Sequence, residues 1–273
     1  MKANSGGHCV AQDRNFDDLT DRFERNLYGS PKGRLRLQLV QRELAATSRV
    51  LAEGKPLRVL DLGCGLGQMA QWLAAQGHAV TACDISPRMV ARARERIQSL
   101  DPAAAANIEF RALSLQELAT SLSGRFELVL FHAVIEWLAD PQAGLREASQ
   151  WVADDGELSL LFYNRASLVF KNLLRGDFRR VDEDDFAGDP GGLTPSHPLE
   201  IDQVHEWTNA LGLDIVSTRG IRSFSDYMPQ ALDRRKPPTA TEEEILRMEW
   251  TIGNSSPFRE LARYQLWLAK RRA

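Results

Sequence analysis

Three glycines, each two residues from the next, form the clearest ligand-binding pattern in this sequence: Gly63, Gly65 and Gly67. They lie between a predicted strand over residues 57–62 and a predicted helix over residues 66–76. Glycine lets the backbone turn tightly and approach a ligand without a Cβ in the way, and the free N–H groups at the start of the helix then face that ligand. The next predicted strand, residues 79–83, leads into Asp84 about twenty residues later, which suits a carboxylate that holds ribose hydroxyls. The pattern therefore predicts a ligand that contains a ribose.

Two better-known glycine loops fit this segment less well. The dinucleotide fingerprint is G-x-G-x-x-G, whereas here the third glycine comes one residue early and Gln68 stands in the last place. No Lys-Ser/Thr follows, so the segment is not a P-loop. A purely structural turn is the other alternative, but a strand before the loop, a helix after it, Asp61 within it and Asp84 beyond it coincide. This combination resembles the S-adenosylmethionine site of class I methyltransferases, over residues 56–163.

The resemblance implies where the cofactor lies. The glycine loop passes beside its methionine part, the acid after the second strand takes both ribose hydroxyls, and residues 113–116 frame the adenine. His132 follows the predicted strand 126–131, at the kind of strand end that lines the ligand crevice of such sheets. Cys64 is interpreted as a small residue beside the cofactor rather than as a nucleophile. The expected cofactor contacts are Asp61, Gly63, Cys64, Gly65, Asp84, Leu115, Gln116 and His132.

Short apolar runs alternate with helix-length segments between residues 56 and 163. Such alternation requires crossover connections, and hence a parallel sheet that is covered on both faces. Right-handed crossovers then give an α/β fold with a Rossmann-like, doubly wound, mostly parallel sheet. The five predicted strands are residues 57–62, 79–83, 108–112, 126–131 and 157–163.

The rest of the chain adds helices and loops to this core. Residues 1–11 are polar and are expected to fray. Residues 12–55 are expected to be helical, with Ser30 as a cap and Pro31 in the first turn of a helix. This segment either lids the site or packs on the sheet. The remaining domain, residues 56–273, is predicted to carry insertions at 164–200 and 225–256, and residues 260–269 fit either a strand or a helix.

Segments outside the glycine loop carry a more specific resemblance. They are residues 12–19 (QDRNFDDL), 25–36 (RNLYGSPKGRLR), 131–141 (FHAVIEWLADP), 161–164 (LFYN) and 220–227 (GIRSFSDY). Together they resemble the bacterial tRNA 5-carboxymethoxyuridine methyltransferases over residues 12–269. That family methylates the carboxylate of 5-carboxymethoxyuridine at the tRNA wobble position, which gives the methyl ester, 5-methoxycarbonylmethoxyuridine. The resemblance implies a tRNA anticodon stem-loop as partner. It also places Arg36 at the methionine carboxylate of the cofactor, which an Arg can hold bidentately.

The implied reaction needs no catalytic base. A carboxylate has a pKa near 4, so at neutral pH the nucleophile is already ionised, and in-line attack on the sulfonium methyl needs positioning and desolvation. We therefore assign no catalytic residue. Tyr163 and Asn164 are the first candidates to orient the substrate carboxylate, because they end the fifth predicted strand. Further candidates are Arg14, Tyr28, Arg222 and Tyr227.

A basic stretch precedes an acidic one in the first insertion. The loop around residues 181–192 is acidic, whereas the family it resembles is lysine-rich there. Either this loop does not touch RNA, or the basic contact has moved to neighbouring residues; an ordinary solvated charged face is the alternative. The candidate RNA contacts are Arg165, Lys171, Arg175, Arg179 and Arg180.

Composition limits the partners. The 273 residues carry a formal net charge of −3, so there is no overall basic coat and DNA is not an expected partner. The three cysteines are scattered and suggest neither a disulfide framework nor a metal site, which favours a reducing compartment. No run approaches the ~20 apolar residues that cross a bilayer, and no signal peptide is apparent, so we expect a cytoplasmic protein without a membrane partner. The oligomeric state stays open between a monomer and a weak dimer.

Two other functions and a second cofactor stay open at this level. The same core serves many substrates, so a small-molecule carboxylate or phenol O-methyltransferase is one alternative. A non-catalytic S-adenosylmethionine-binding module is the other. A carboxylated form of the cofactor would require an additional cation near the methyl position. Salt-dependent binding would indicate RNA, and turnover would exclude the silent module.

Overall fold

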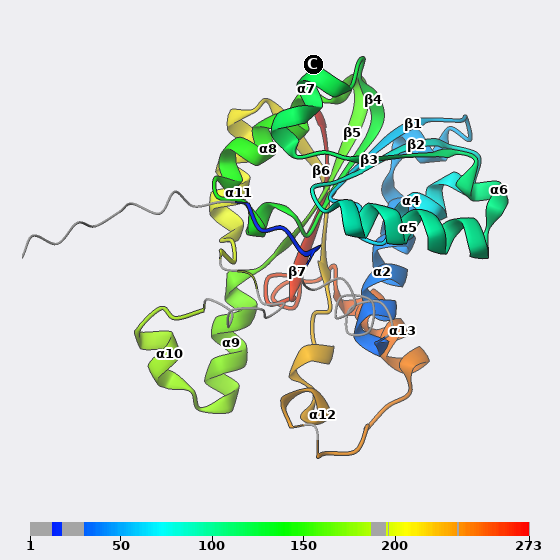
Figure 1. Cartoon of the computed structure of the whole chain (residues 1–273). Coiled ribbons are helices and arrows are strands. Elements are labelled where there is room, and N and C mark those ends of the chain that lie inside the picture. Colours follow the sequence, from blue (N-terminus) through cyan, green and yellow to red (C-terminus); the bar gives the residue numbers. More distant parts are fainter. Residues whose placement is uncertain (1–12, 18–29, 187–194, 196, 234, 273) are drawn as a thin grey trace, which may run out of the picture.

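The computed structural model describes residues 13–17, 30–186, 195, 197–233 and 235–272. Within these residues seven strands form one sheet, in the order β3-β2-β1-β4-β5-β7-β6 (Figure 1). Strands β1 to β5 pair in parallel, and β7 pairs antiparallel with both β5 and β6. The predicted α/β fold with a mostly parallel sheet is confirmed, and residues 260–269 contribute to a strand rather than a helix. The strands are β1 (Arg58–Leu62), β2 (Ala79–Asp84), β3 (Ile108–Ala112), β4 (Phe126–His132), β5 (Val152–Tyr163), β6 (Leu213–Ile221) and β7 (Tyr264–Arg271).

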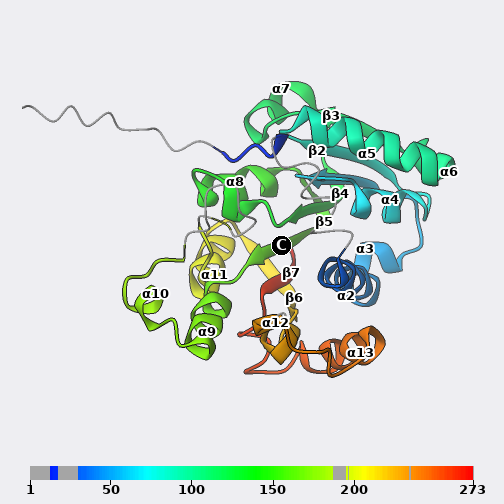
Figure 2. The same ribbon diagram turned by 60° about the horizontal axis from the view of Figure 1, so that its bottom comes forward.

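Helices cover both faces of this sheet (Figure 2). Helices α2, α4 and α5 pack on one face, and α7, α8 and α11 on the other. Successive side chains of a strand point to opposite faces, so in β1 Val59 joins the first core cluster, whereas Leu60 and Leu62 join the second. The helices are α2 (Pro31–Thr47), α3 (Arg49–Ala52), α4 (Gln68–Ala74), α5 (Pro87–Leu100), α6 (Pro102–Ala105), η3 (Leu115–Glu117), α7 (Leu118–Ser121), η4 (Ile135–Trp137), α8 (Pro141–Gln150), α9 (Arg165–Arg175), α10 (Phe178–Asp182), α11 (Ile201–Ala210), η5 (Ser225–Tyr227), α12 (Pro229–Leu232) and α13 (Glu242–Ile252).

Helix α2 begins at the predicted cap. The Ser30 side chain accepts a hydrogen bond from the Gly33 N–H at 3.1 Å, and Pro31 occupies the first turn, where its missing N–H costs nothing. Leu39 and Leu44 are buried in the core, so α2 is fixed on the sheet and presents Arg36 near the strand ends. Residues 18–29, which were also predicted to be helical, lie outside the described part of the chain.

Two helical additions follow the carboxyl ends of β5 and β6. Helices α9 and α10 come after β5, and η5, α12 and α13 come after β6; α9, α10 and α12 project beyond the sheet (Figure 1). They fall within the predicted insertions at residues 164–200 and 225–256. Because ligands bind at the carboxyl ends of parallel strands, these additions lie at the functional end of the sheet. None of the helices in the described ranges is long and apolar enough to cross a membrane.

Candidate active site

The glycine loop lies against the turn that follows β4. Gly63 has a φ of 69°, and a Cβ added there would lie 2.2 Å from the Val134 Cγ2 atom, so no side chain fits. Gly67, with a φ of 72°, caps the start of α4. The Cys64 N–H donates to the Cys83 carbonyl at 2.9 Å, which ties the loop to β2. The loop is therefore held closely between two strand ends, with the amino end of α4 behind it.

Asp84 connects this loop to the end of β2. One carboxylate oxygen accepts from the Gly65 N–H at 2.9 Å, and the other accepts from the Ser86 N–H at 2.9 Å. Burial raises the pKa of Asp84, although these two N–H groups act in the opposite direction. The same carboxylate lies on the wall of a pocket, so it can accept further hydrogen bonds from a ligand.

Two adjoining pockets open at the carboxyl ends of the strands. The larger has ≈ 850 Å³ of empty space, including its solvent-open part, and the smaller has ≈ 460 Å³. Gly63, His132, Ala133 and Arg36 line both pockets, so the two form one continuous depression. Expected cofactor contacts in the larger pocket are Arg36, Gly63, Gly65, Asp84, Leu115 and His132. Those in the smaller pocket are Arg36, Asp61, Gly63, Cys64 and His132.

The smaller pocket is lined by residues of opposite charge, Asp61 and Arg36. Asp61 is buried, and one of its carboxylate oxygens has no hydrogen-bond partner among the described residues. Burial, and then the charge of Asp84, raise the pKa of Asp61 to about 7. Arg36 supplies the positive charge from α2. A zwitterionic group fits such a pocket, because it can give a cation to Asp61 and an anion to Arg36.

His132 and Cys64 are unreactive parts of the wall. The His132 Nε2 atom lies 2.7 Å from the Ser159 hydroxyl. Burial, and then the positive charge of Arg36, lower the pKa of His132 to about 3, so the imidazole is neutral at physiological pH. Burial raises the pKa of the Cys64 thiol well above its ordinary value, which keeps it protonated. Both residues therefore shape the pocket rather than carry a charge there.

Glu136 is a second buried acid beside the site. Its side chain is 1% exposed, and neither carboxylate oxygen has a hydrogen-bond partner in the described ranges. Burial raises the pKa of Glu136 to about 8. The preceding Ala133 has a φ of 56°, an uncommon conformation for a residue with a Cβ. The turn after β4 thus holds both a strained backbone and an uncompensated acid.

The sequence analysis missed part of the pocket wall. Asp13 and Phe16 line the larger pocket together with Trp137. The rings of Phe16 and Trp137 meet edge to face at 4.9 Å, and the Arg14 N–H donates to the Trp137 carbonyl at 3.1 Å. These contacts bring residues 13–17 to the turn after β4. Only the flanking family motif could have indicated them, because an irregular segment carries no periodicity.

Gln116 is the one expected cofactor contact outside both pocket walls. Its side-chain N–H donates instead to Asp13 at 3.2 Å. The adjacent Leu115 does line the larger pocket. Gln116 therefore connects η3 to the N-terminal segment.

Three of the candidates for orienting the substrate are engaged within the protein. The Asn164 amide donates to the Glu260 and Ala262 carbonyls and caps α9, and its side chain is fully buried. The Tyr163 hydroxyl accepts from Arg263 at 2.5 Å. The Tyr227 hydroxyl donates to the Leu261 carbonyl. Structure-forming bonds thus use the polar atoms of Asn164, and a substrate-orienting role for Tyr163 and Asn164 stays a prediction.

The other three candidates for orienting the substrate lie in different parts of the chain. Arg14 lines the larger pocket. Arg222 lies buried near Asp226, and its φ is 63°. Tyr28 lies outside the described residues.

Most of the candidate RNA contacts already have acidic partners. Arg165 pairs with Asp184 and with Glu200. Arg179 pairs with Glu183, and Arg180 with Asp177. Arg175 donates to the Leu232 carbonyl, and Lys171 is half-buried. Two acids in the described part of the acidic loop, Glu183 and Asp184, thus pair with the basic stretch; residues 187–192 of that loop lie outside the described ranges.

Comparisons with known proteins agree with this geometry. A methyltransferase-domain family model matches residues 60–158. The tRNA 5-carboxymethoxyuridine methyltransferases of Escherichia coli O157:H7 and K12 are each 37% identical to the chain over 259 residues, which is 93% of this chain and 94% of theirs. The ubiquinone biosynthesis O-methyltransferase of Xanthomonas axonopodis is 34% identical, over only 41% of this chain and 46% of that protein.

Solved structures show the same fold at low sequence identity. The magnesium protoporphyrin IX methyltransferase of Synechocystis, solved with bound SAH, has a TM-score of 0.60 at 17% identity and covers 94% of this chain and 95% of its own. A putative methyltransferase in complex with the Trm112 activator of Haloferax volcanii has a TM-score of 0.62 at 16% identity, over 96% of this chain and 99% of its own. Similarity to the Escherichia coli proteins extends over nearly the whole length, beyond the shared fold. The chain belongs to the tRNA 5-carboxymethoxyuridine methyltransferase family.

Proposed function

We propose that this protein transfers a methyl group from S-adenosylmethionine to the carboxylate of 5-carboxymethoxyuridine at the wobble position of tRNA. The products are the methyl ester and S-adenosylhomocysteine. One observation carries the proposal: 37% identity over 93% of the chain to enzymes named for this substrate. The pocket supports it, because its walls have the charges and the glycine loop that such a cofactor needs.

The cofactor residues follow from the charges on the walls. Arg36 and Asp61 face the smaller pocket and would hold the carboxylate and the ammonium of the methionine part. Asp84 would accept the ribose hydroxyls in the larger pocket, and Leu115 would pack against the adenine. When bound, S-adenosylmethionine supplies an electrophilic methyl group. Gly63, Cys64, Gly65 and His132 complete the wall.

The protein supplies position and a dry environment rather than a base. The substrate carboxylate is already ionised at neutral pH, and His132 is neutral, so no proton has to move. Phe16 and Trp137 line one side of the larger pocket with apolar rings, which would keep water from a ligand bound there. Rate acceleration then comes from holding the carboxylate in line with the methyl group.

The partner is a tRNA anticodon stem-loop, whose wobble base can leave the stack and enter the pocket. A tRNA substrate supports the cytoplasmic location that the sequence predicts. Phosphate contacts predict an affinity that falls with salt. The α9–α10 side chains contribute less to these contacts than the sequence suggested, because acids of the same segment pair with them.

The test is conversion of the modified nucleoside in tRNA. Purified protein is incubated with S-adenosylmethionine and tRNA from a strain that lacks this protein, and the nucleosides are analysed by mass spectrometry. We expect 5-carboxymethoxyuridine to disappear as its methyl ester forms. Bound S-adenosylmethionine without conversion would reject the tRNA assignment and favour a small-molecule methyltransferase or a silent binding module.

A further inference from the structure

A group of charged side chains lies at the carboxyl ends of β5 and β6 and at the amino end of β7, outside the two pockets. Asp226 is at its centre and accepts from Arg222 at 2.5 Å, from Lys32 at 2.8 Å and from Arg263 at 3.1 Å. Lys171 comes from α9, which packs beside Asp226: the rings of Phe170 and Tyr227 meet edge to face at 5.0 Å, and Lys171 interacts electrostatically with Arg263 and Asp226. We call Asp226, Arg222, Lys32, Arg263 and Lys171 the Asp226 cluster. Its members come from α2, α9, the turn after β6 and the start of β7.

The Asp226 cluster has more positive charges than its acid can balance. Among the described residues, Arg222, Arg263 and Lys32 have no ion-pair partner except Asp226. Arg222 is 8% exposed, and its buried Nε–H has no hydrogen-bond partner in the part of the chain that the structure describes. Burial alone would raise the pKa of Asp226, but the surrounding cations hold it well below its ordinary value. Buried cations are costly unless they are paired, so this group lacks an anion.

Lys171 is the cation of the cluster that has the fewest bonds. Its ammonium makes no hydrogen bond or ion pair with any residue in the described ranges. Burial, and then the positive charge of Arg263, lower the pKa of Lys171 to about 8. The side chain of Lys32 is 46% exposed, so the cluster also reaches the surface. A ligand from solution can therefore approach it.

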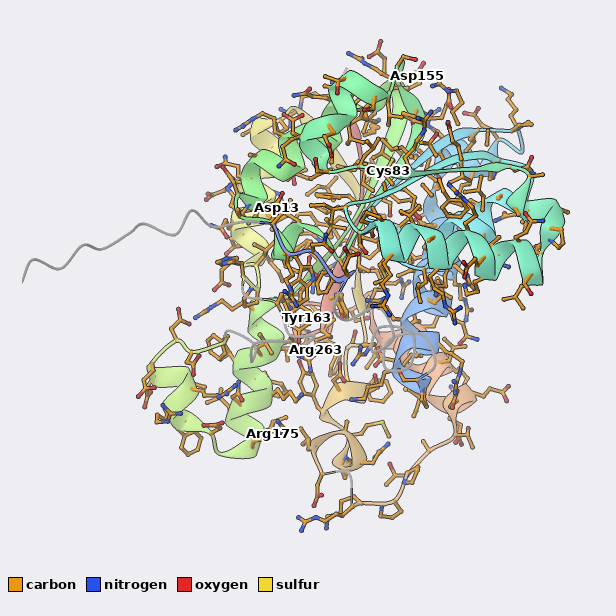
Figure 3. All side chains as sticks on the ribbon, in the orientation of Figure 1. Asp13, Cys83, Asp155, Tyr163, Arg175 and Arg263 are labelled. Carbon is orange, nitrogen blue, oxygen red and sulfur yellow. The ribbon has the colours of Figure 1, made fainter. Side chains whose placement is uncertain are left out.

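The cluster lies next to the cofactor pocket. The Arg222 guanidinium lies 5.9 Å from the Tyr264 ring centre, and the Arg36 guanidinium lies 5.4 Å from the same ring. Arg36 lines both pockets. Arg263 donates to the Tyr163 hydroxyl at the end of β5, and both residues lie between α9 and α2 (Figure 3). One aromatic ring thus separates the excess positive charge from the cofactor site.

We propose that the Asp226 cluster is a subsite for an anionic oxygen group of the RNA substrate, with Arg222 and Lys171 as the residues that bind it. This inference rests on the proposed function, which supplies the RNA. Two groups of that RNA share the required chemistry, namely the carboxylate of the modified base and a neighbouring backbone phosphate. Either gives the buried Nε–H of Arg222 an acceptor and gives Lys171 an ion pair.

The experiment measures binding of two anticodon stem-loops that differ only at the wobble position. One carries 5-carboxymethoxyuridine and the other carries uridine, and the full-length protein is saturated with S-adenosylhomocysteine. The variants are Lys171→Met and Arg222→Gln, with Arg222→Lys to restore the charge. Arg219→Gln is the matched control, because Arg219 is equally buried but pairs with Glu43 away from the cluster.

The two RNAs separate the two anions. If the carboxylate occupies the subsite, Lys171→Met and Arg222→Gln weaken binding of the modified RNA by roughly tenfold or more and leave the unmodified RNA unchanged. If a phosphate occupies it, the affinity for both RNAs falls by the same factor. The slope of log affinity against log salt then becomes shallower by about one. Arg222→Lys recovers part of the loss in either case.

Unchanged binding of both RNAs by Lys171→Met would overturn the inference, and so would losses that Arg219→Gln reproduces. Lys171 is partly exposed, so its variant tests the subsite even if Arg222→Gln folds poorly. Affinity for S-adenosylhomocysteine, measured on each variant, shows whether the fold is intact. Turnover by the unchanged protein tests the proposed function separately. If the unchanged protein turns over the substrate but the variants bind both RNAs normally, the subsite is rejected and the proposed function stands.

Discussion

At the scale of single residues, Asp84 has two roles that depend on one carboxylate. It fixes the Gly65 and Ser86 N–H groups and also faces the pocket. We expect Asp84→Asn to weaken binding of S-adenosylhomocysteine by roughly 10- to 100-fold, because hydrogen bonds to a charged group contribute about 1.5–3 kcal/mol. Isothermal titration calorimetry measures this.

Asp101→Asn is the control for that substitution. Asp101 also accepts a backbone N–H, from Ala104 at 3.0 Å, but it caps α6 away from the pocket. Equal affinity in the two variants would show that Asp84 does not touch the cofactor.

Glu136 makes stability depend on pH. An unfolded Glu has a pKa near 4.3, whereas burial raises the pKa of Glu136 to about 8. As the pH rises, the unfolded state therefore loses this proton first. The contribution of Glu136 to the free energy of unfolding is complete below about pH 4 and is lost as the pH rises toward 8. Asp61, with its pKa raised to about 7, acts in the same direction. The ligand-free protein should be more stable at pH 5 than at pH 8.

Glu136→Gln tests this dependence. Glutamine cannot ionise, so the difference in free energy of unfolding between pH 5 and pH 8 should shrink by about 1 kcal/mol or more. Urea unfolding at both pH values provides the measurement. The exposed Glu95 is the control, and an equal reduction in Glu95→Gln would contradict the assignment.

At the scale of elements, α9 and α10 carry the basic candidates, and acids that directly follow α10 pair with two of them. Arg165 pairs with Asp184, and Arg179 with Glu183. Removing these acids should free Arg179 for phosphate and leave Arg165 with Glu200 as its acidic partner. We expect the double variant Glu183→Gln, Asp184→Asn to bind tRNA several-fold more tightly at low salt, with a salt slope steeper by about one.

Asn suits position 184, because its φ of 53° is a conformation that Asn adopts readily. Asp154→Asn is the control. It frees Arg125 in the same way, but it lies beside Asp155, which is at the top of the view, whereas Arg175 of α9 lies in its lower half (Figure 3). An equal gain in the control would mean that net charge alone, rather than α9 and α10, determines the affinity.

The elements also show what the sequence could predict. Strands such as β1 and β2 were predictable, because a short apolar run bounded by a glycine loop or a helix is typical of a buried strand. The start of β5 was placed at residue 157, whereas the strand begins at Val152, which pairs with Phe126. Pairing of this kind depends on the partner strand and leaves no local pattern.

The candidate site was predictable to a similar degree. The glycine loop and Asp84 form a local motif, so their positions follow from the chain itself. The Asp226 cluster joins Lys32 to Arg263, which are far apart in sequence, and only the fold brings them together. Asn164 shows the opposite limit. A polar residue at a strand end suggested a ligand contact, but in the structure its side chain caps α9.

At the scale of the whole molecule, β7 holds the second half of the sheet together. It pairs with β5 over residues 264–270 and with β6 over residues 264–271. A chain that ends at residue 263 would leave β6 without a partner and would open a wide edge on β5. We expect this truncation to abolish folding, which circular dichroism and size-exclusion chromatography would show.

Removal of residues 272 and 273 alone is the control. Arg272 forms an exposed ion pair with Asp214, so its loss should cost at most about 1 kcal/mol. A folded, cofactor-binding protein after removal of β7 would show that β6 is dispensable for the sheet.

The position of β7 also constrains biosynthesis. During translation β5 and β6 leave the ribosome before the strand that separates them, so both keep unpaired backbone groups until the residues of β7 emerge. If β5 and β6 paired with each other instead, they would occupy the place of β7 and the native strand order could not form. The nascent chain therefore passes through an interval with exposed strand edges, which are sites of aggregation. The stage before β7 emerges is therefore the one at which this half of the sheet is most exposed to aggregation.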